Sequence, residues 1–290
     1  MLLITGVTGL TGRFLIDCLR EAGYSGYIRC LVRKHSDVSW IKDKGVDLCL
    51  GDVGDVESLK TALAGASGMI HLVNIRFSPQ IIQACRATGV KRVIIVTTTG
   101  IYSKYRECSD EYRQLEKEIM SSGLDYTIIR PTMIYGNQLD KNIHKLVKVI
   151  DKFPVVPVIG NGKGLMQPIF ARDLAGVIAE AYMRPVSIDK AYNVAGKSPV
   201  EYAGVLKLIT AALGKKRIFV RVPYAFALLA GYVGEKVPNG LIDLEKVKRL
   251  REDKVFDYSE AVRDLGFNPI SFEEGIVIEV AALRKAGIIA

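Results

Sequence analysis

Short apolar runs alternate with segments of helical periodicity through the first half of the chain. The runs that predict strands are Leu2 to Thr5, Tyr27 to Val32, Asp47 to Leu50, Met69 to Val73, Arg92 to Thr97 and Tyr126 to Arg130. Most of them are too continuously apolar for a sheet that is wet on one face. The alternation is typical of parallel strands joined by crossover helices, so we expect an α/β fold, a doubly wound parallel sheet with helices on both faces.

Glycine, proline and serine positions predict where several helices begin and end. A first helix should stop at Gly23, because glycine is common directly after a helix. A second should have Ser78 as its N-cap, ahead of Pro79, and should end at Gly89. The remaining helices are expected over residues 36–44 and 109–122, from Ser198 and Pro199, and from the capping box of Ser271 and Glu274.

The regular alternation fades after Tyr135 and Gly136 into mixed helices and short strands. We therefore expect an N-terminal α/β domain over residues 1–136 and a smaller C-terminal lobe over most of residues 137–290, with the chain free to cross between the two. No repeat or low-complexity segment interrupts this organisation.

Composition narrows the class of protein. The chain has 290 residues, 49% of them hydrophobic and 24% charged, which excludes a disordered chain and a small disulfide scaffold. The five cysteines are odd in number and lie far apart, so neither a disulfide framework nor a metal site is expected. A strand-like run opens the sequence and no apolar stretch reaches the length of about 20 residues that a bilayer requires. We expect a cytoplasmic protein without a membrane span.

The charge balance is basic, with 40 Lys and Arg against 31 Asp and Glu, a net charge of +9. That sign suits an anionic ligand such as a phosphate-bearing cofactor, and it also suits nucleic acid. Basic residues recur mostly singly or in pairs and never in a run of five, which favours a mixed solvated surface over a nucleic-acid interface.

A glycine-rich turn, Gly6-Val-Thr-Gly9-Leu-Thr-Gly12, follows the first strand and precedes an amphipathic helix. Glycines permit a tight turn and a close approach of the backbone to a pyrophosphate, and the helix N-terminus supplies N–H groups and a positive dipole. This position between strand and helix predicts a Rossmann-type dinucleotide site. The candidate contacts in the turn are Gly6, Thr8, Gly9, Leu10 and Gly12.

The second predicted strand ends in Leu31-Val32-Arg33-Lys34, with cations and no carboxylate. In dinucleotide folds an acidic residue at this place receives the ribose 2′-hydroxyl, whereas an arginine accommodates a 2′-phosphate. Arg33 and Lys34 therefore favour NADP(H) over NAD(H) as cofactor. The alternative is that both are ordinary solvated loop charges.

The spacing G-x-x-G-x-x-G resembles the extended and atypical branch of the short-chain dehydrogenase/reductase superfamily, the NAD-dependent epimerase/dehydratase-like proteins. Further segments are similar to that family in its own order: Gly51-Asp52-Val53, Ile70 to Asn74, Thr97 to Tyr102 and Ile129 to Gly136. The resemblance implies further cofactor contacts at Asp52, Val53, Val73, Asn74, Thr97, Arg130, Pro131 and Thr132.

The resemblance continues through Pro168 to Ala175 and Tyr258 to Pro269, so it covers most of the chain. It implies that residues 137 onward form mainly a substrate lobe, that the sheet has seven strands, and that homodimers are frequent. The implied substrate is a small molecule, a nucleotide sugar among the candidates.

The catalytic pattern of that family is broken. Its members carry a proton-transferring tyrosine, a lysine four residues later, and a Ser or Thr that orients the substrate hydroxyl. Counting back from Gly123, Cys108 and Tyr112 occupy the Tyr and Lys places, and Glu116 puts a carboxylate one turn beyond Tyr112, where it would raise the pKa of a neighbouring phenol. Thr98 keeps the hydroxyl position. The catalytic candidates are therefore Thr98 and Tyr112.

Other side chains could carry protons in their place. Alternative acids are the tyrosines Tyr102, Tyr105 and Tyr135. His71 lies in a buried-strand run and should be a hydrogen-bonded core imidazole, whereas His35 and His144 are expected at the surface.

Two functions remain open. The first is an NADP(H)-binding oxidoreductase, epimerase or reductase that acts on a carbonyl or hydroxyl carbon of a small or nucleotide-sugar-like substrate. The second is a catalytically silent NAD(P)H-binding regulator or assembly factor, which the broken Tyr/Lys pair motivates. Fold alone does not choose between them, because function resides in the site.

Overall fold

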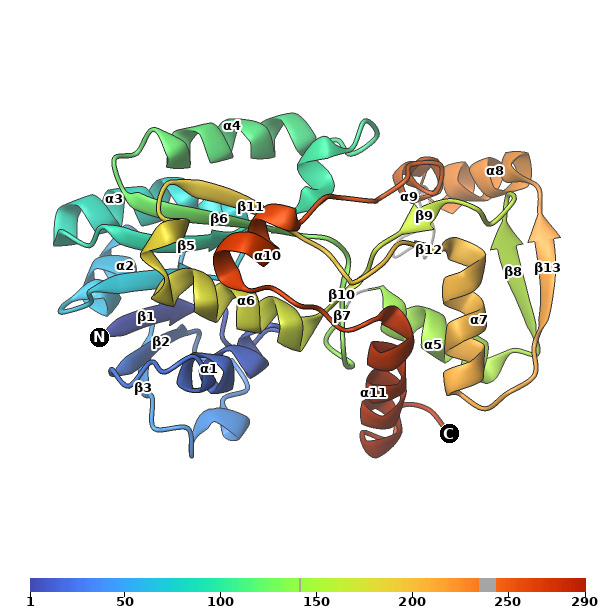
Figure 1. The fold of residues 1–290 in the computed structure, drawn as a ribbon, viewed down its shortest axis with the longest axis horizontal. Coiled ribbons are helices and arrows are strands. Elements are labelled where there is room, and N and C mark those ends of the chain that lie inside the picture. Colours follow the sequence, from blue (N-terminus) through green and yellow to red (C-terminus); the bar gives the residue numbers. More distant parts are fainter. Residues whose placement is uncertain (141, 235–243) are drawn as a thin grey trace.

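A single parallel sheet forms the centre of the N-terminal half (Figure 1). In the computed structural model, which describes residues 1–140, 142–234 and 244–290, its strands are β1 (Leu2–Thr5), β2 (Ile28–Val32), β3 (Asp47–Leu50), β4 (Gly68–His71), β5 (Arg92–Val96), β6 (Asp125–Pro131) and β11 (Lys190–Val194). The seven strands run in the order β11-β6-β5-β4-β1-β2-β3, and all pairs are parallel. The order reverses between β1 and β4.

Helices cover both faces of this sheet. The helices α1 (Gly12–Glu21) and α6 (Ala171–Met183) lie on one face, and α2 (Val56–Leu63), α3 (Ser78–Thr88) and α4 (Ser109–Met120) lie on the other (Figure 1). Because strand side chains alternate, Leu2 and Ile4 join the core on the α1 side and Leu3 joins the core on the α2 side. The predicted doubly wound α/β fold is confirmed.

The six strands predicted from apolar runs are all present, with ends that differ by two residues at most. The seventh, β11, comes from the second half of the sequence and pairs with β6, Tyr192 opposite Ile129. Its sequence, KAYNV, is too polar to stand out as an apolar run. The seven strands that the family resemblance implied are therefore present, but pattern alone did not locate the last one.

Three predicted helix starts are wrong. Residues 36–44 form only the short 3-10 helix η1 (Ser39–Ile41), because the segment lacks a continuous apolar stripe. After Ser198 and Pro199 the chain first makes a short strand, and the helix begins at Tyr202. Ser78 is the first residue of α3 instead of its cap, because Asn74 already caps the 3-10 helix η2 (Ile75–Phe77) that runs into α3.

The C-terminal lobe has its own apolar core between α5 (Ile143–Lys152), α7 (Tyr202–Ala212), α11 (Phe272–Lys285) and the parallel pair β8 (Val155–Ile159) and β13 (Ile218–Val222). The predicted capping box of Ser271 and Glu274 is confirmed at the start of α11. The remaining elements are β7 (Ile134–Tyr135), β9 (Leu165–Met166), β10 (Ile169–Phe170), β12 (Val200–Glu201), α8 (Tyr224–Gly234), α9 (Leu244–Arg249), α10 (Ser259–Leu265), η3 (Thr99–Tyr102) and η4 (Pro185–Ser187).

The chain passes between the two halves more than once. The helix α6 and the strand β11 belong to the sheet half, and α10 packs against both of them before the chain returns to the lobe as α11. The domain boundary at residue 136 therefore stays a prediction. Figure 1 shows directly that the chain crosses between the two halves. The same view shows that the carboxyl ends of the strands face the lobe.

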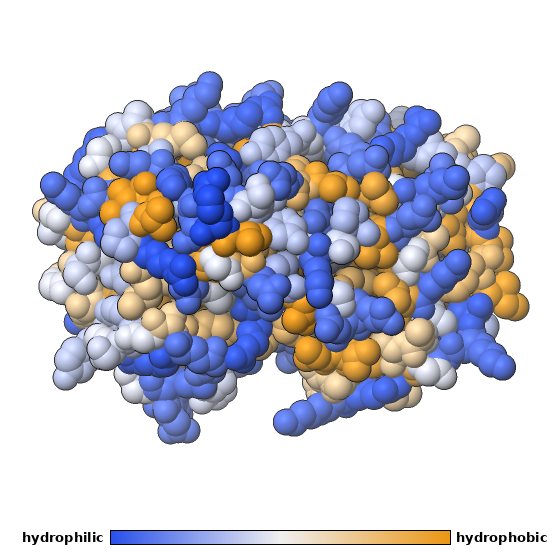
Figure 2. Space-filling view, in the orientation of Figure 1, coloured by the Kyte–Doolittle hydropathy of each residue, from blue (hydrophilic) through white to orange (hydrophobic). Residues whose placement is uncertain are grey.

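The surface is mixed in character. Figure 2 shows apolar side chains gathered at the end of the lobe that β8 and β13 form, with hydrophilic side chains interspersed over the rest of that face. Val155 on β8 and Ile218 and Val220 on β13 are exposed apolar side chains of these two strands. Among the helices of the described residues, none combines the length and the apolar character needed to cross a bilayer.

Candidate functional site

The turn after β1 has a backbone that accepts only glycine at two of its positions. Gly6 has φ +78°, and a Cβ added there would lie 2.9 Å from Cγ2 of Val73. A Cβ on Gly12 would lie 2.5 Å from Cα of Val7, which is backbone and cannot turn aside. The N–H of Gly9 donates to the carbonyl of Gly6 at 3.0 Å and closes the turn. The backbone therefore remains open to the approach of a ligand, as the sequence predicts.

The N-terminus of α1 points its dipole into this turn. Its cap residue, Thr11, makes no side-chain capping hydrogen bond, and the first turn of the helix holds no acidic side chain. An uncapped helix N-terminus next to a glycine turn attracts an anion through its N–H groups and its positive dipole. Leu10 lies half-buried in the same turn and Gly9 is exposed.

A cavity of about 150 Å³ lies beside this turn at the carboxyl ends of β1 to β4. It brings together six residues that the sequence singles out: Gly6, Thr8, Arg33, Asp52, Val53 and Val73. It also includes Gly51 of the family-like segment Gly51-Asp52-Val53, and four residues that were not proposed as contacts, namely Leu31, Val32, Ser36 and Phe77. Phe77 had a usable signal, because it is an aromatic residue directly ahead of a predicted helix start.

The polar residues of the cavity are held by local turns. The N–H of Arg33 donates to Oγ of Ser36 at 3.2 Å, and the N–H of Ser36 donates to the carbonyl of Arg33 at 2.9 Å. Oδ1 of Asp52 accepts from the N–H of Gly54 at 2.8 Å. Within the described residues no ion pair neutralises Arg33, which is exposed, and Lys34 is not part of the lining. The lining therefore holds one cation, Arg33, and one carboxylate, Asp52, and among the described residues neither is in an ion pair.

Thr98 stands at the end of β5, on the other side of the point where the strand order reverses. Its hydroxyl accepts from the N–H of Gly100 at 3.0 Å and so caps η3. Nη1 of Arg106 donates to the same oxygen at 3.3 Å, and Nε of Arg106 reaches Sγ of Cys108 at 3.2 Å. Thr98 thus has a structural role, and its own O–H proton remains available for a further hydrogen bond.

Tyr112 is buried on α4 and is tied to Asn74. Nδ2 of Asn74 donates to the phenol oxygen at 2.9 Å, and the phenol lies 3.2 Å from Oδ1 of the same amide. The guanidinium carbons of Arg76 and Arg106 lie 5.5 and 5.1 Å from the centre of the ring. The structure therefore brings a predicted catalytic residue and a predicted cofactor contact together.

His71 fixes the base of this arrangement. Its Nε2 lies 3.2 Å from the carbonyl oxygen of Asn74, which can only accept, so Nε2 carries the proton and Nδ1 accepts from the Thr5 hydroxyl at 2.7 Å. Burial lowers the pKa of His71 to about 4. The ring is therefore neutral at pH 7, and its prediction as a core imidazole is confirmed.

Glu116 does not face Tyr112 as expected. Its carboxylate pairs with Arg130 on β6, where Nε and Nη2 donate to Oε2 at 2.9 and 2.6 Å, and Oε1 accepts from the Thr97 hydroxyl at 2.7 Å. Burial opposes the charge of Arg130, yet the hydrogen bonds and charge of Glu116 prevail and raise its pKa. Arg130 thus neutralises the charge of Glu116. The sequence pattern did not predict this ion pair.

The neighbouring strand-end residues are also engaged. Nη1 of Arg130 donates to the phenol oxygen of Tyr102 at 3.2 Å. The carbonyl of Pro131 accepts from the Thr99 hydroxyl at 3.2 Å, and the Thr132 hydroxyl donates to the carbonyl of Gln167 at 2.5 Å. These three predicted cofactor contacts line the end of β6, and Arg130 has its guanidinium largely committed to protein partners.

Two expectations about other proton carriers are wrong. Tyr135 lies fully buried between Phe170 and Phe272 in the lobe core, where burial raises its pKa far above the ordinary value. His144 is not a surface residue, because its side chain is 15% exposed and its Nδ1 lies 3.4 Å from Asp140. Tyr102 and Tyr105 remain exposed near the end of β5.

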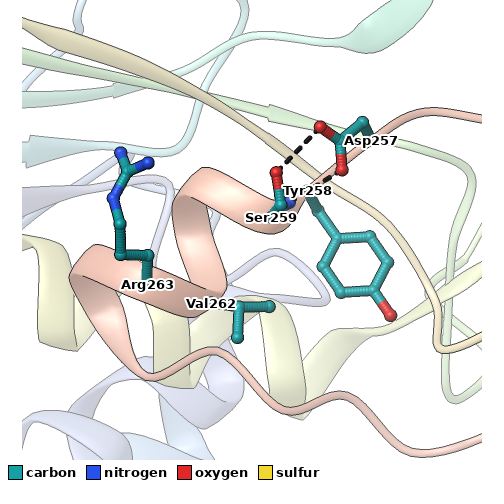
Figure 3. A pocket seen from close by; sticks show the side chains of 5 residues that line it. All are labelled: Asp257, Tyr258, Ser259, Val262 and Arg263. Carbon is teal, nitrogen blue, oxygen red and sulfur yellow. Dashed lines mark hydrogen bonds between the residues drawn. The ribbon is translucent and has the colours of Figure 1, made fainter.

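A second hollow, of about 340 Å³, lies at α10 and is lined by Asp257, Tyr258, Ser259, Val262 and Arg263 (Figure 3). Asp257 accepts from the N–H and the hydroxyl of Ser259 at 3.0 and 2.8 Å, and Arg263 pairs with Asp264. One short segment forms this hollow and its charged groups already have partners. No group of three or more His, Cys, Asp or Glu side chains suited to a metal occurs within the described ranges.

The glycine turn, the uncapped helix and the cavity across the ends of β1 to β4 are what a pyrophosphate and an adenosine require, so the residues fit a bound dinucleotide. They define a Rossmann-type dinucleotide-binding protein. The chain belongs to the NAD(P)H-binding family, whose model matches residues 6–154.

Relatives with several kinds of names align with most of the chain at 23 to 26% identity. Quinone oxidoreductase 2 of Escherichia coli (strain K12) is 26% identical over 253 residues, which cover 84% of this chain and 85% of that protein. The NAD(P)H azoreductase of Xenophilus azovorans is 26% identical over 251 residues, 84% of each chain. The photosystem II assembly factor Ycf39 of Cyanophora paradoxa is 23% identical over 252 residues, 79% of this chain and 74% of that one.

Solved structures show the same fold. The NADPH complex of the quinone oxidoreductase of Escherichia coli superposes with a TM-score of 0.77 at 22% identity, covering 95% of this chain and 98% of that one. A nucleoside-diphosphate-sugar epimerase from Pseudomonas aeruginosa has a TM-score of 0.80 at 18% identity, covering 100% and 99%. The resemblance to the atypical short-chain dehydrogenase/reductase proteins is confirmed.

Proposed function

We propose that the protein is an NADPH-dependent oxidoreductase that reduces quinone-like acceptors. The observation that carries the proposal is the cavity beside the glycine turn, where Arg33 is the cation of the lining. The names of two relatives, a quinone oxidoreductase and an azoreductase, support the reaction class.

The preference for NADPH rests on the end of β2. A 2′-phosphate needs cationic donors, and Arg33 lines the cavity with the hydroxyl of Ser36 beside it. The nearest acidic residue of the lining, Asp52, has one carboxylate oxygen committed to the N–H of Gly54. Asp37 follows in the same loop, but it pairs with Arg13 at 3.0 Å. Arg33, with Lys34 directly after it, therefore supplies the cations at the ribose end, and Asp52 is the one unpaired carboxylate in the described lining.

The chain's own residues arrange the other end of the site. Residues at the ends of β2 and β3 would hold the adenosine of a dinucleotide, and its other end would reach across the point of reversed strand order toward β5, where Thr98 and Pro131 stand. When bound, the nicotinamide supplies a hydride. Asn74 donates to Tyr112 and Arg130 donates to Glu116, so hydrogen bonds to α4 fix both sides of this end.

The altered Tyr/Lys pair favours reduction over epimerisation. Oxidising a sugar alcohol needs a base for its hydroxyl proton, and Cys108 and Tyr112 do not reproduce the family's Tyr and Lys. Reduction of a quinone needs no such base. The oxygen that is reduced becomes a phenolate, whose conjugate phenol has a pKa of about 10, so water can protonate it. The overall reaction is NADPH, a quinone and one proton giving NADP⁺ and the hydroquinone.

Cofactor titration tests the first half of the proposal. NADPH should bind at least about tenfold more tightly than NADH, a difference of about 1.4 kcal/mol. The Arg33→Gln variant should lose that difference, whereas Lys42→Gln, which removes an equally exposed cation outside the cavity, should keep it. Tighter binding of NADH, or equal loss in both variants, would reject the NADPH assignment.

Turnover tests the second half. NADPH oxidation followed at 340 nm should accelerate with 1,4-benzoquinone or an azo dye and stay at background with UDP-glucose. Tight NADPH binding without oxidation by any acceptor would instead favour the second candidate function, a silent NADPH-binding regulator or assembly factor. The altered Tyr/Lys pair and the likeness to an assembly factor support that alternative. The homodimer and the cytoplasmic location stay predictions.

A further inference from the structure

Arg106 is a half-buried cation whose hydrogen bonds all go to neutral partners. Its guanidinium donates to Oγ1 of Thr98 at 3.3 Å and to Sγ of Cys108 at 3.2 Å, and its Cζ lies 5.1 Å from the centre of the Tyr112 ring. Within the described residues no ion pair joins it to a carboxylate. A positive charge held in this way is available to an anionic ligand.

Gly100 makes room for this side chain. A Cβ built on Gly100 would collide with Nη1 of Arg106 and lie 3.0 Å from its Cζ. Gly100 is buried and its φ does not require glycine. The guanidinium therefore packs directly against Gly100, and a side chain there would displace it.

Arg76 provides an internal comparison. Its Cζ lies 5.5 Å from the same Tyr112 ring, but Nε and Nη2 donate to the carboxylate of Glu111 at 2.7 and 2.6 Å. Glu111 neutralises the charge of Arg76, and both side chains are exposed to solvent. Arg76 is therefore not a site for an anionic ligand. Two guanidiniums thus contact one ring, and Arg106 alone of the two lacks a counter-charge among the described residues.

The place of Arg106 in the fold connects it with the reaction. It stands with Thr98 at the carboxyl end of β5, across the reversed strand order from the cavity at β2 and β3. Ligands of doubly wound sheets lie across this point, with one end of the dinucleotide on each side. The end of β5 is consequently the side where the acceptor would meet the nicotinamide.

We propose that Arg106 is an oxyanion-binding residue, which takes the acceptor oxygen that gains negative charge, with the Thr98 hydroxyl beside it. The acceptor class is a quinone or another conjugated carbonyl whose reduced form is a stabilised oxyanion. The role of Arg106 in catalysis rests on the proposed function. Bound NADPH would supply a hydride to the quinone and become NADP⁺. One quinone oxygen would then carry the negative charge against the Arg106 guanidinium, and one proton from solvent would complete the hydroquinone.

A binding measurement tests the anion site without any turnover. Calorimetric titration of the whole protein with 4-nitrophenolate, with and without NADP⁺, should show binding that weakens at least about tenfold in Arg106→Gln and less in Arg106→Lys. Gly100→Ala should weaken it too, because the guanidinium must move. Arg76→Gln is the matched control and should bind like wild type. Equal binding by wild type and Arg106→Gln, equal loss in Arg76→Gln, or no binding would overturn the proposal.

Kinetics with 1,4-benzoquinone separate this inference from the proposed function. Arg106→Gln should lower kcat about a hundredfold, the usual effect of removing one donor from a developing oxyanion, with the NADPH dissociation constant within twofold of wild type. Turnover in wild type with unchanged kcat in Arg106→Gln would overturn the role of Arg106 alone. Binding of 4-nitrophenolate that depends on Arg106, in a protein without turnover, would support the anion site and reject the oxidoreductase.

Discussion

The ion pair between Glu116 and Arg130 should be a main support of the sheet half, and Glu116→Gln tests it. The substitution keeps the shape of the side chain and removes its charge. Glu116 is 3% exposed and Arg130 13%, so the remaining guanidinium would be left nearly buried without a counter-charge. Thr97 would still find an acceptor in the glutamine amide.

The size of the effect follows from the burial and the number of contacts. Removing one partner of a buried pair costs about 3 to 5 kcal/mol. Arg130 keeps some solvent and also donates to Tyr102, so we expect the low end, about 3 kcal/mol. Such a loss changes the ratio of folded to unfolded protein by about a hundredfold.

Urea unfolding at pH 7, followed by circular dichroism and by the emission of the one tryptophan, Trp40, measures this loss. Coincident transitions would license a two-state free energy. The control is Glu21→Gln, which breaks the exposed pair with Arg172 and should cost less than about 1 kcal/mol. A Glu116→Gln protein within about 0.5 kcal/mol of wild type would refute the reasoning from burial.

Three further substitutions test other parts of the structure. Gly12→Ala should weaken NADPH binding at least about tenfold in a fluorescence titration, whereas Gly176→Ala, whose Cβ meets no atom within 4 Å, should bind normally and gain up to about 1 kcal/mol in stability. Burial and the nearby Asp140 raise the pKa of Glu279 to about 10, so the folded state holds a proton that the unfolded state releases above about pH 4.5. Urea unfolding should therefore show Glu279→Gln gaining on wild type by roughly 1 kcal/mol per pH unit between pH 5 and 8, and a constant difference would contradict the assignment. Ser271→Ala should cost about 1 kcal/mol in thermal unfolding through the lost cap of α11, and a loss below about 0.3 kcal/mol would count against that cap.

The parts of the molecule that could be predicted depend on local sequence. The strands β1 to β6 show as apolar runs because both of their faces are buried, and the turn from Gly6 to Gly12 shows because its backbone excludes side chains. The same locality explains the success at Ser271, where the cap and its partner are three residues apart. The place of Arg33 in the cavity could be predicted for a similar reason. It directly follows β2, which pairs with β1 and so lies beside the turn.

The parts that could not be predicted depend on contacts between distant segments. The edge strand β11 is polar and becomes a strand only by pairing with β6, about 60 residues earlier. Phe77 enters the cavity because η2 turns the chain back over Gly54. The partner of Glu116 is Arg130 on the strand β6. The helical spacing within α4 alone therefore suggested the wrong neighbour, Tyr112. Helix starts failed where an upstream cap, such as Asn74, began the turn earlier.

The face of α4 that should carry catalysis now holds the structure together. Tyr112 and Glu116 are one turn apart, and each reaches a different element, Asn74 after β4 and Arg130 on β6. Side chains tied to the scaffold on both sides have little freedom to approach a substrate. Ahead of the helix, Arg106 lies beside Thr98 at the end of β5 and brings a charge there. Under the proposal for Arg106, charge stabilisation at the end of β5 takes the place of the proton transfer that the family's Tyr/Lys pair performs.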